Sequence, residues 1–176
     1  MNIYIDLDET LVDIITPTLK WLNSTFGILE ERKNIKYYSY LQDKHGPPII
    51  DFWSDSYLYD RDIAKPFEGA IEFVNTLKAK DLNIFILSNC TDKNYLAKIK
   101  YVNRHFNISS FIPCFHNKKW EFLKKDDILV DDHYSNCISH TMINDGKSIL
   151  FNYDGVNPWA SESKFTTYDS VIERIK

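Results

Sequence analysis

The stretch that decides the fold is residues 2–10, Asn2-Ile3-Tyr4-Ile5-Asp6-Leu7-Asp8-Glu9-Thr10. Its first half is apolar, with β-branched and aromatic side chains, and its second half is acidic. This change is typical of a buried strand whose carboxyl end carries polar chemistry. Because side chains alternate along an extended segment, Asp6 and Asp8 are expected on the same side, so two carboxylates should converge where the strand ends.

Four further apolar runs are similar to the first, at residues 82–87, 111–115, 127–131 and 147–152. Segments with helical periodicity lie between several of them. Strands that alternate with helices indicate a parallel sheet, because parallel neighbours need a long crossover connection. The sequence therefore predicts an α/β protein with a Rossmann-like parallel sheet and crossover helices.

The predicted helices cover residues 69–80, 92–106, about 134–144 and 166–175. In the second, four apolar residues recur at helical spacing and are expected to face the core: Leu96, Ile99, Val102 and Phe106. In the third, the same spacing places Ile138 and Met142 on one face.

Residues 13–65 interrupt the alternation of strands and helices. They are rich in Tyr and Trp, carry Gly46-Pro47-Pro48, and contain helical fragments but no convincing strand. We interpret them as a small helical cap inserted after the first strand, with residues 1–12 and 66–176 forming the core.

Composition excludes some classes of function. A formal net charge of -4 argues against a protein that coats long nucleic acids, which needs a basic face. The three cysteines, Cys90, Cys114 and Cys137, are odd in number and irregularly spaced, which indicates a reducing compartment and predicts a cytoplasmic location. No run is long enough to span a membrane, so no membrane association is expected.

More polar residues follow the later strands. Asp131-Asp132 ends another apolar strand, so Asp6, Asp8, Asp131 and Asp132 could surround one octahedral site for Mg²⁺, which prefers such oxygens. Ser88-Asn89 follows the strand at 82–87 and offers a hydroxyl and backbone N–H groups to a phosphoryl oxygen. A lysine between Ser88 and the second acidic pair could neutralise a phosphate, and the candidates are Lys118, Lys119 and Lys124.

In the order acidic pair, hydroxyl, lysine, acidic pair, these elements resemble the four motifs of the haloacid dehalogenase-like (HAD) hydrolases over residues 3–132. The resemblance implies a magnesium-dependent phosphatase. Asp6 would attack phosphorus and form an aspartyl-phosphate intermediate. Asp8 would protonate the leaving oxygen and later activate water, while its backbone carbonyl helps to hold the metal.

The resemblance implies the remaining roles. Ser88 would bind the transferring phosphoryl group, and Lys118, favoured because it closely follows the strand at 111–115, would stabilise its charge. Asp131 and Asp132 would complete the metal site, and Thr10 would orient the first loop.

Within that superfamily, the chain looks like the 5'(3')-deoxyribonucleotidases, on the evidence of its length, its insert and the segments 66–70, 100–105 and 128–132. This implies deoxyribonucleoside monophosphates as substrates. Aromatic rings of the insert could sandwich a base, with Phe52 and Trp53 favoured, and Asn89 and Lys119 are also expected to contact substrate. Glu9 stands where many members have Gly and is expected to add negative charge near the mouth of the site.

Other functions stay open. The same chemistry could act on a sugar phosphate or a 3'-phosphorylated nucleic acid end. A zinc module could use Cys114, His116, His133, Cys137 and His140. A catalytically silent protein of the same fold could bind a partner through the aromatic cap. The expected partner is a small phosphomonoester, most simply a nucleotide, and a homodimer is left open.

Overall fold

The computed structural model describes residues 1–175 and contains a five-stranded parallel sheet in the order β5-β4-β1-β6-β7. Its strands are β1 (Asn2–Ile5), β4 (Asn83–Asn89), β5 (Phe111–Cys114), β6 (Ile128–Asp131) and β7 (Lys147–Leu150). All five sequence-predicted strands are present. The Rossmann-like α/β prediction is therefore confirmed.

The register of the sheet brings the chemistry-bearing strand ends together. Ile5, the last residue of β1, pairs with Ile86 of β4 on one side and Val130 of β6 on the other. Asp6 consequently follows β1 at the level where β6 ends in Asp131. Ligands of open α/β sheets bind at such carboxyl ends, beside the point where the strand order reverses.

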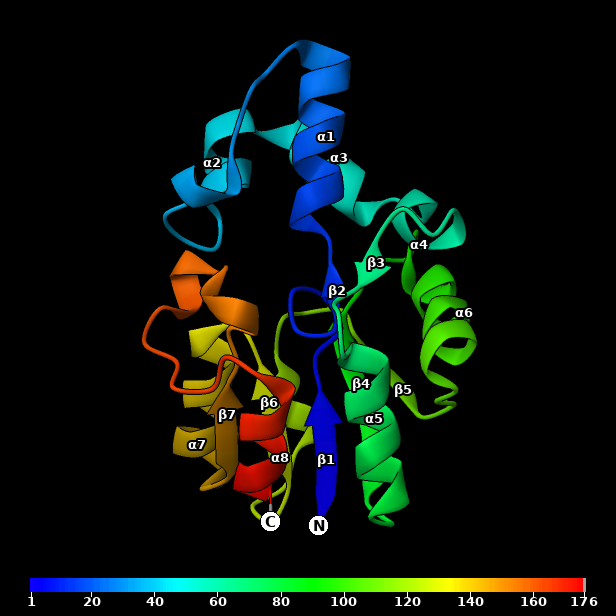
Figure 1. The fold of residues 1–176 in the computed structure, drawn as a ribbon, viewed down its shortest axis with the longest axis vertical. Coiled ribbons are helices and arrows are strands. Elements are labelled where there is room, and N and C mark those ends of the chain that lie inside the picture. Colours follow the sequence, from blue (N-terminus) through cyan, green and yellow to red (C-terminus); the bar gives the residue numbers. More distant parts are fainter. Residues whose placement is uncertain (176) are drawn as a thin grey trace.

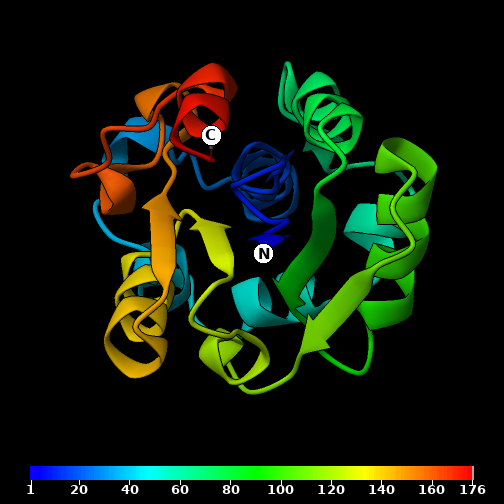
Figure 2. The same cartoon turned by 90° about the horizontal axis from the view of Figure 1, so that it is seen from below.

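Helices cover both faces of the sheet (Figure 2). On one face, α5 (Ala70–Ala79), α6 (Tyr95–Phe106) and α8 (Tyr168–Ile175) bury Ile3 and Ile5. On the other lie α7 (Tyr134–Asn144) and the short 3-10 helix η2 (Lys119–Phe122), with Tyr4 and Leu129 in a smaller cluster. Because β1 is buried on both faces, its apolar run positions Asp6 firmly.

The regular structure of the segment between β1 and α5 is mostly helical. It contains α1 (Ile15–Phe26), η1 (Arg32–Asn34), α2 (Tyr40–His45), α3 (Pro47–Ser54) and α4 (Tyr57–Asp60). A two-stranded antiparallel ribbon, β2 (Val12–Asp13) with β3 (Lys65–Pro66), closes its base. Helices α1, α2 and α3 lie beyond the carboxyl ends of the strands, on the side opposite both chain termini (Figure 1). We propose that this segment is a cap and the remainder the core.

Two further 3-10 helices, η3 (Tyr153–Gly155) and η4 (Pro158–Ala160), connect β7 to α8. Within residues 1–175, no helix has the length and apolar character needed to cross a bilayer.

The helical faces differ from the sequence prediction. In α6 the buried residues are Ala97, Lys98, Tyr101, Val102 and Phe106, whereas Leu96 is exposed. In α7 the buried residues are Asn136, Cys137 and His140, and Met142 is 78% exposed. The prediction was correct for Val102 and Phe106 and wrong for Leu96 and Met142, because both helices also bury polar side chains, which apolar periodicity does not detect.

Candidate active site

Asp6 occupies the end of β1 and is almost completely buried. Its N–H donates to the Val130 carbonyl at 2.9 Å, which continues the pairing with β6 by one residue. The Asp6 Oδ1 atom accepts a hydrogen bond from the Leu7 N–H at 2.8 Å. The backbone that follows β1, which is paired with β6, thereby holds the carboxylate at the centre of the carboxyl edge of the sheet.

Asp131 and Asp132 end β6 beside Asp6, and both are buried. Asp131 accepts hydrogen bonds from the His133 N–H at 2.8 Å and from the Asn136 side-chain amide at 3.1 Å. Asp132 accepts one from the Trp159 indole at 2.7 Å, and its N–H donates to the Thr10 hydroxyl at 3.1 Å. Thr10 thus ties the first loop to the second acidic pair.

Lys119 is the cation of this cluster. Its side chain is fully buried, and Nζ lies 2.7 Å from Asp6 Oδ1 and 2.7 Å from Asp131 Oδ2. Burial alone would lower the pKa of this amine, but the charges of Asp131 and Asp6 outweigh it and raise the pKa above its ordinary value. Lys119 therefore stays charged and joins the two strand ends.

One lysine does not balance three carboxylates. Desolvation, with Asp131 and Asp8 adding repulsion, raises the pKa of Asp6 from 3.8 to about 7 even with Lys119 beside it. Desolvation and the charges of Asp131 and Asp6 likewise raise the pKa of Asp132 well above its usual range. Oxygen atoms of Asp6, Asp131 and Asp132 lie within 4.8 Å of one another. This hard, oxygen-only donor set with excess negative charge fits Mg²⁺.

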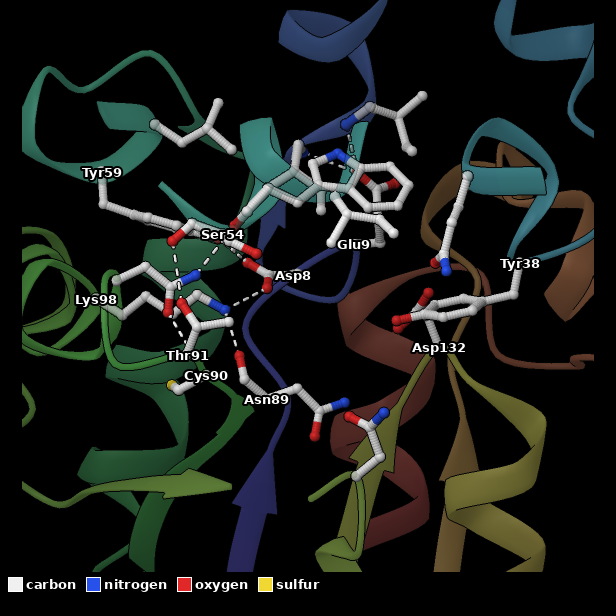
Figure 3. Close-up of a pocket in the computed structure, with 18 of the residues that line it drawn as sticks. Asp8, Glu9, Tyr38, Ser54, Tyr59, Asn89, Cys90, Thr91, Lys98 and Asp132 are labelled. Atoms are coloured by element: carbon white, nitrogen blue, oxygen red, sulfur yellow. Dashed lines mark hydrogen bonds and ion pairs between the residues drawn. The ribbon is translucent and has the colours of Figure 1, made fainter. Parts of the chain in front are cut away.

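The Asp8 carboxylate lies outside that group of three. Because β1 ends at Ile5, the strand alternation used to place Asp8 does not extend to it; instead Leu11 and Val12 N–H groups return to the Leu7 carbonyl in a tight turn. Asp8 Oδ2 lies 2.6 Å from Lys98 Nζ, and Asp8 Oδ1 accepts the Tyr59 hydroxyl (Figure 3). Its side chain does not join the predicted set of four carboxylate ligands.

Ser88 and Asn89 end β4 as predicted, next to β1. The Ser88 hydroxyl is fully buried and accepts a hydrogen bond from Lys98 Nζ at 3.1 Å. Asn89 lines the cavity described below, and within residues 1–175 its buried side-chain oxygen has no hydrogen-bond partner. An orphaned acceptor at such a place is available to a ligand.

A cavity of about 330 Å³ lies between the helical insert and the strand ends. The core contributes Asp8, Asn89 and Asp132, and the insert contributes Tyr38 (Figure 3). Trp53 of the insert also lines the cavity. Trp159 and Phe115 add further aromatic surface. The cavity therefore combines carboxylates with rings, which is the composition of a small-molecule site.

The other sequence candidates have different surroundings. Lys118 is about half exposed and its amine lies 3.4 Å from Glu121, and Lys124 is also exposed, so Lys119 occupies the position that the sequence analysis gave to Lys118. Phe52 stacks on Trp21 with ring centroids 4.4 Å apart and does not line the cavity, whereas Trp53 does.

Glu9 does not place a free charge at the mouth. It is buried, its Oε1 atom accepts the N–H groups of Ile14 and Ile15 at 2.8 and 2.9 Å, and its Oε2 atom pairs with Arg32. Burial raises the pKa of Glu9 to about 7 in spite of Arg32. This expectation was wrong because the residue caps the start of α1 instead of facing solvent.

Within residues 1–175, Asp6, Asp131 and Asp132 form the one group of three potential metal ligands. The cysteines and histidines of the zinc alternative do not form such a group. Cys114 packs in the small apolar cluster, and the buried His140 lies 3.2 Å from the Asp127 carbonyl oxygen.

Sequence reasoning missed four residues that contact the candidate site residues: Tyr59, Lys98, Asn136 and Trp159. For Lys98 a signal existed, because it lies at helical spacing from Tyr101 and Val102 on one face of α6. A lysine on a buried face is rarely left without a partner. Trp159 offered no comparable pattern.

Comparisons with known proteins agree on the fold. No protein-family model and no curated protein matches the sequence. Among solved structures, the chain is similar to a HAD family hydrolase from Deinococcus radiodurans R1 with bound phosphate and sodium, at a TM-score of 0.66 and 16% identity, covering 99% of this chain and 94% of that one.

Two further structures share the architecture. One is a predicted phosphatase from Clostridium acetobutylicum, with a TM-score of 0.65, 15% identity, and coverage of 99% and 97%. The other is a dehalogenase with an intermediate complex, with a TM-score of 0.66, 12% identity, and coverage of 98% and 96%. The chain therefore has the fold of HAD hydrolases and phosphatases.

Replacing Lys119 by Met is expected to destabilise the metal-free protein by about 3–5 kcal/mol at pH 8, because Asp6 and Asp131 lose their buried counter-charge. The adjacent Lys118→Met change is the matched control and should stay within about 0.5 kcal/mol, since its amine is exposed. Urea unfolding in EDTA measures both. Equal effects of the two substitutions would contradict the assignment of Lys119 to the cluster.

The raised pKa of Asp6 makes stability depend on pH. Between about pH 4 and pH 7 the folded chain holds a proton that the unfolded chain has lost, so the metal-free protein should become less stable as pH rises through this window. Mg²⁺ at a hundredfold excess over its Kd should raise Tm by roughly 5–10 °C at pH 8. The increase should be smaller at pH 5, where protons compete. Thermal unfolding by circular dichroism, with and without Mg²⁺, measures both, and a pH-independent increase would argue against these carboxylates as ligands.

Proposed function

We propose that this chain is a magnesium-dependent phosphomonoesterase in which Asp6 forms an aspartyl-phosphate intermediate. The observation that carries the proposal is the buried cluster in which Lys119 joins Asp6 to Asp131, with Asp132 beside them. A carboxylate so placed is a nucleophile backed by a lysine. The raised pKa values of Asp6 and Asp132, caused by desolvation and by neighbouring carboxylates, support a need for a cation before an anionic substrate can approach.

The side chains support a division of roles. Lys119 and the Leu7 N–H hold Asp6 Oδ1, which leaves Oδ2 to attack phosphorus. Asp6, Asp131 and Asp132 would hold Mg²⁺, which would supply charge neutralisation for the phosphoryl oxygens. Asp8 faces the cavity and is suited to give a proton to the leaving oxygen, and afterwards to take one from the water that hydrolyses the intermediate.

The fold alone does not select phosphoryl transfer, because a dehalogenase shares it. The acidic site does favour it. Three buried carboxylates would repel the carboxylate of a small organic acid, and they become attractive to an anion only through a bound cation. With a cation held there, Lys119 would add a second positive charge beside Asp6, so a phosphomonoester fits the charges of the site.

For the substrate we infer a nucleoside monophosphate, with a deoxyribonucleotide as the first candidate and hence a 5'-nucleotidase activity. Tyr38, Trp53, Phe115 and Trp159 give the cavity flat apolar surface next to Asp8, and rings of this kind stack on bases. The cavity volume of about 330 Å³ is within the roughly 300–1,000 Å³ of small-molecule sites, which favours a small ligand over a long nucleic acid.

The cellular location and the partner that we propose follow from the cysteines and from the cavity. The three cysteines are free and buried, in keeping with the cytoplasmic location expected from the sequence. The partner is a small phosphorylated molecule, and the chain could act as a monomer or homodimer.

The first test is phosphate release from deoxyribonucleoside and ribonucleoside 5'- and 3'-monophosphates, sugar phosphates and a 3'-phosphorylated oligonucleotide. We expect release that requires Mg²⁺, stops in EDTA, and falls at least about 10⁴-fold in Asp6→Asn, because the nucleophile is lost. Borohydride trapping should convert residue 6 of the wild type to homoserine by reducing the acyl phosphate. An Asp6→Asn variant with a near-normal rate would overturn the mechanism.

The panel also separates the substrates. Preference for deoxyribonucleotides supports the nucleotidase assignment, whereas release only from sugar phosphates or the oligonucleotide keeps the mechanism and rejects that substrate. No release from any compound would favour a binding protein that retains the fold.

Tyr38→Ala should raise KM for the preferred nucleotide about tenfold and leave KM for glycerol phosphate within about twofold, because only the nucleotide reaches the ring. Phe52→Ala is the control, since this ring stacks on Trp21 away from the cavity and its removal should leave both KM values unchanged. Steady-state kinetics on both substrates measures the difference. A larger effect of Phe52→Ala would place the base elsewhere.

A further inference from the structure

Lys98 is a buried amine that the family resemblance did not identify. It belongs to α6, and its side chain is only 3% exposed. Its Nζ atom donates to Asp8 Oδ2 at 2.6 Å, to the Asn89 carbonyl at 2.6 Å and to the Ser88 hydroxyl at 3.1 Å. An ammonium group has three protons, so one side chain satisfies all its donors on the Asp8 loop and the end of β4.

Tyr59 completes this arrangement from the helical insert. Its hydroxyl donates to Asp8 Oδ1, and its ring lies with its centroid 5.2 Å from Lys98 Nζ. Both oxygens of the Asp8 carboxylate are therefore engaged, one by Lys98 and one by Tyr59 (Figure 3). This fixes the direction of the carboxylate as well as its position.

The direction matters because two destinations are open to Asp8. The buried group formed by Asp6, Asp131 and Asp132 attracts a cation, and a free carboxylate two residues along the chain could turn toward that cation as a fourth ligand. Held by Lys98 and Tyr59, the Asp8 side chain lines the cavity instead. Asn89 and Asp132 line the same cavity, so Asp8 faces the space between β4 and β6 where a substrate can enter.

Packing alone does not explain Lys98. The neighbouring buried positions of α6 are Ala97, Tyr101 and Val102, and an apolar side chain would fill the same face without the cost of desolvating an amine. A lysine at this position supplies a positive charge, and the carboxylate with which it forms an ion pair is that of Asp8.

We propose that Lys98 is a positioning residue for leaving-group protonation: it holds the Asp8 carboxylate toward the cavity and keeps it in register with the phosphoryl-binding Ser88. Tyr59 supports it on the second oxygen. The proposal rests on the proposed function, since it assigns Asp8 the role of acid and base.

Two substrates of similar size distinguish positioning of Asp8 from general structural support. The leaving group of p-nitrophenyl phosphate departs as a stable anion, whereas that of phenyl phosphate depends on protonation. The comparison uses kcat/KM, which reports the steps up to formation of the intermediate and is insensitive to its hydrolysis. A misplaced acid impairs only phenyl phosphate in this quantity, while a distorted site impairs both.

Lys98→Met should lower kcat/KM for phenyl phosphate about 100-fold and for p-nitrophenyl phosphate less than about fivefold, the difference being the contribution of a positioned general acid. Tyr59→Phe removes one hydroxyl while keeping the ring, and should show the same selectivity with a loss of about tenfold on phenyl phosphate. If Lys98→Met fails to fold, Tyr59→Phe alone decides the matter. Lys125→Met is the control, because that amine is exposed and pairs with Asp145, and it should behave as wild type.

Equal losses on the two substrates in both variants would make the two residues merely structural and overturn the proposal, as would no loss on either. Failure of the proposed function gives a different result, because the wild type would then release no phosphate from either compound. If the Asp6→Asn substitution left the activity unchanged, that result would also contradict the proposed function, and not the role of Lys98.

Discussion

The ion contacts of Lys119 with Asp6 and Asp131 are the interaction on which the rest of the site depends. They lie where desolvation is most costly, since the lysine and Asp131 are completely buried and Asp6 nearly so. Such a group is stable only if every partner is held in place. Here β1 and β6 fix the two carboxylates, while η2, immediately before β6, supplies the amine.

The surrounding structure compensates for this excess of acid in several ways. The Asn136 amide and the His133 N–H of α7 donate to Asp131, and the Trp159 indole of η4 donates to Asp132. Thr10 and Tyr168 fasten the first loop to the second acidic pair and to α8, through the Thr10 hydroxyl and carbonyl respectively. Elements distant in sequence are thus recruited to one strand edge, which explains why loops after β1, β6 and β7 are closely packed.

Sequence reasoning predicted the sheet, the helical fragments of residues 13–65 and the polar residues at the strand ends, because hydrophobic periodicity and strand-end polarity are local signals. It could not choose between adjacent lysines. The two lysines differ in the direction of their side chains, which depends on the local backbone. Lys118 has a φ of -116° and ψ of 59° just before η2 begins, and Lys119 is the first residue of η2. It also placed Leu96 on the apolar face of α6 and did not use the helical spacing that puts Lys98 on the face of Tyr101 and Val102. Asp8 was misplaced for a related reason, since the end of a four-residue strand and the turn that follows depend on tertiary pairing.

The position of Tyr59 has a wider consequence. This residue is supplied by the helical insert, and α4 is attached to α6 through Arg104, which donates to the Tyr59 carbonyl at 3.1 Å and pairs with Asp62. Asn94 and Thr91 add bonds to the carbonyls of Trp53 and Ser54 at 3.0 Å. The insert therefore both lines the cavity and contacts the Asp8 carboxylate. A change that loosens the contact between α4 and α6 would therefore be felt in two places, in the wall of the cavity and in the direction of the Asp8 carboxylate.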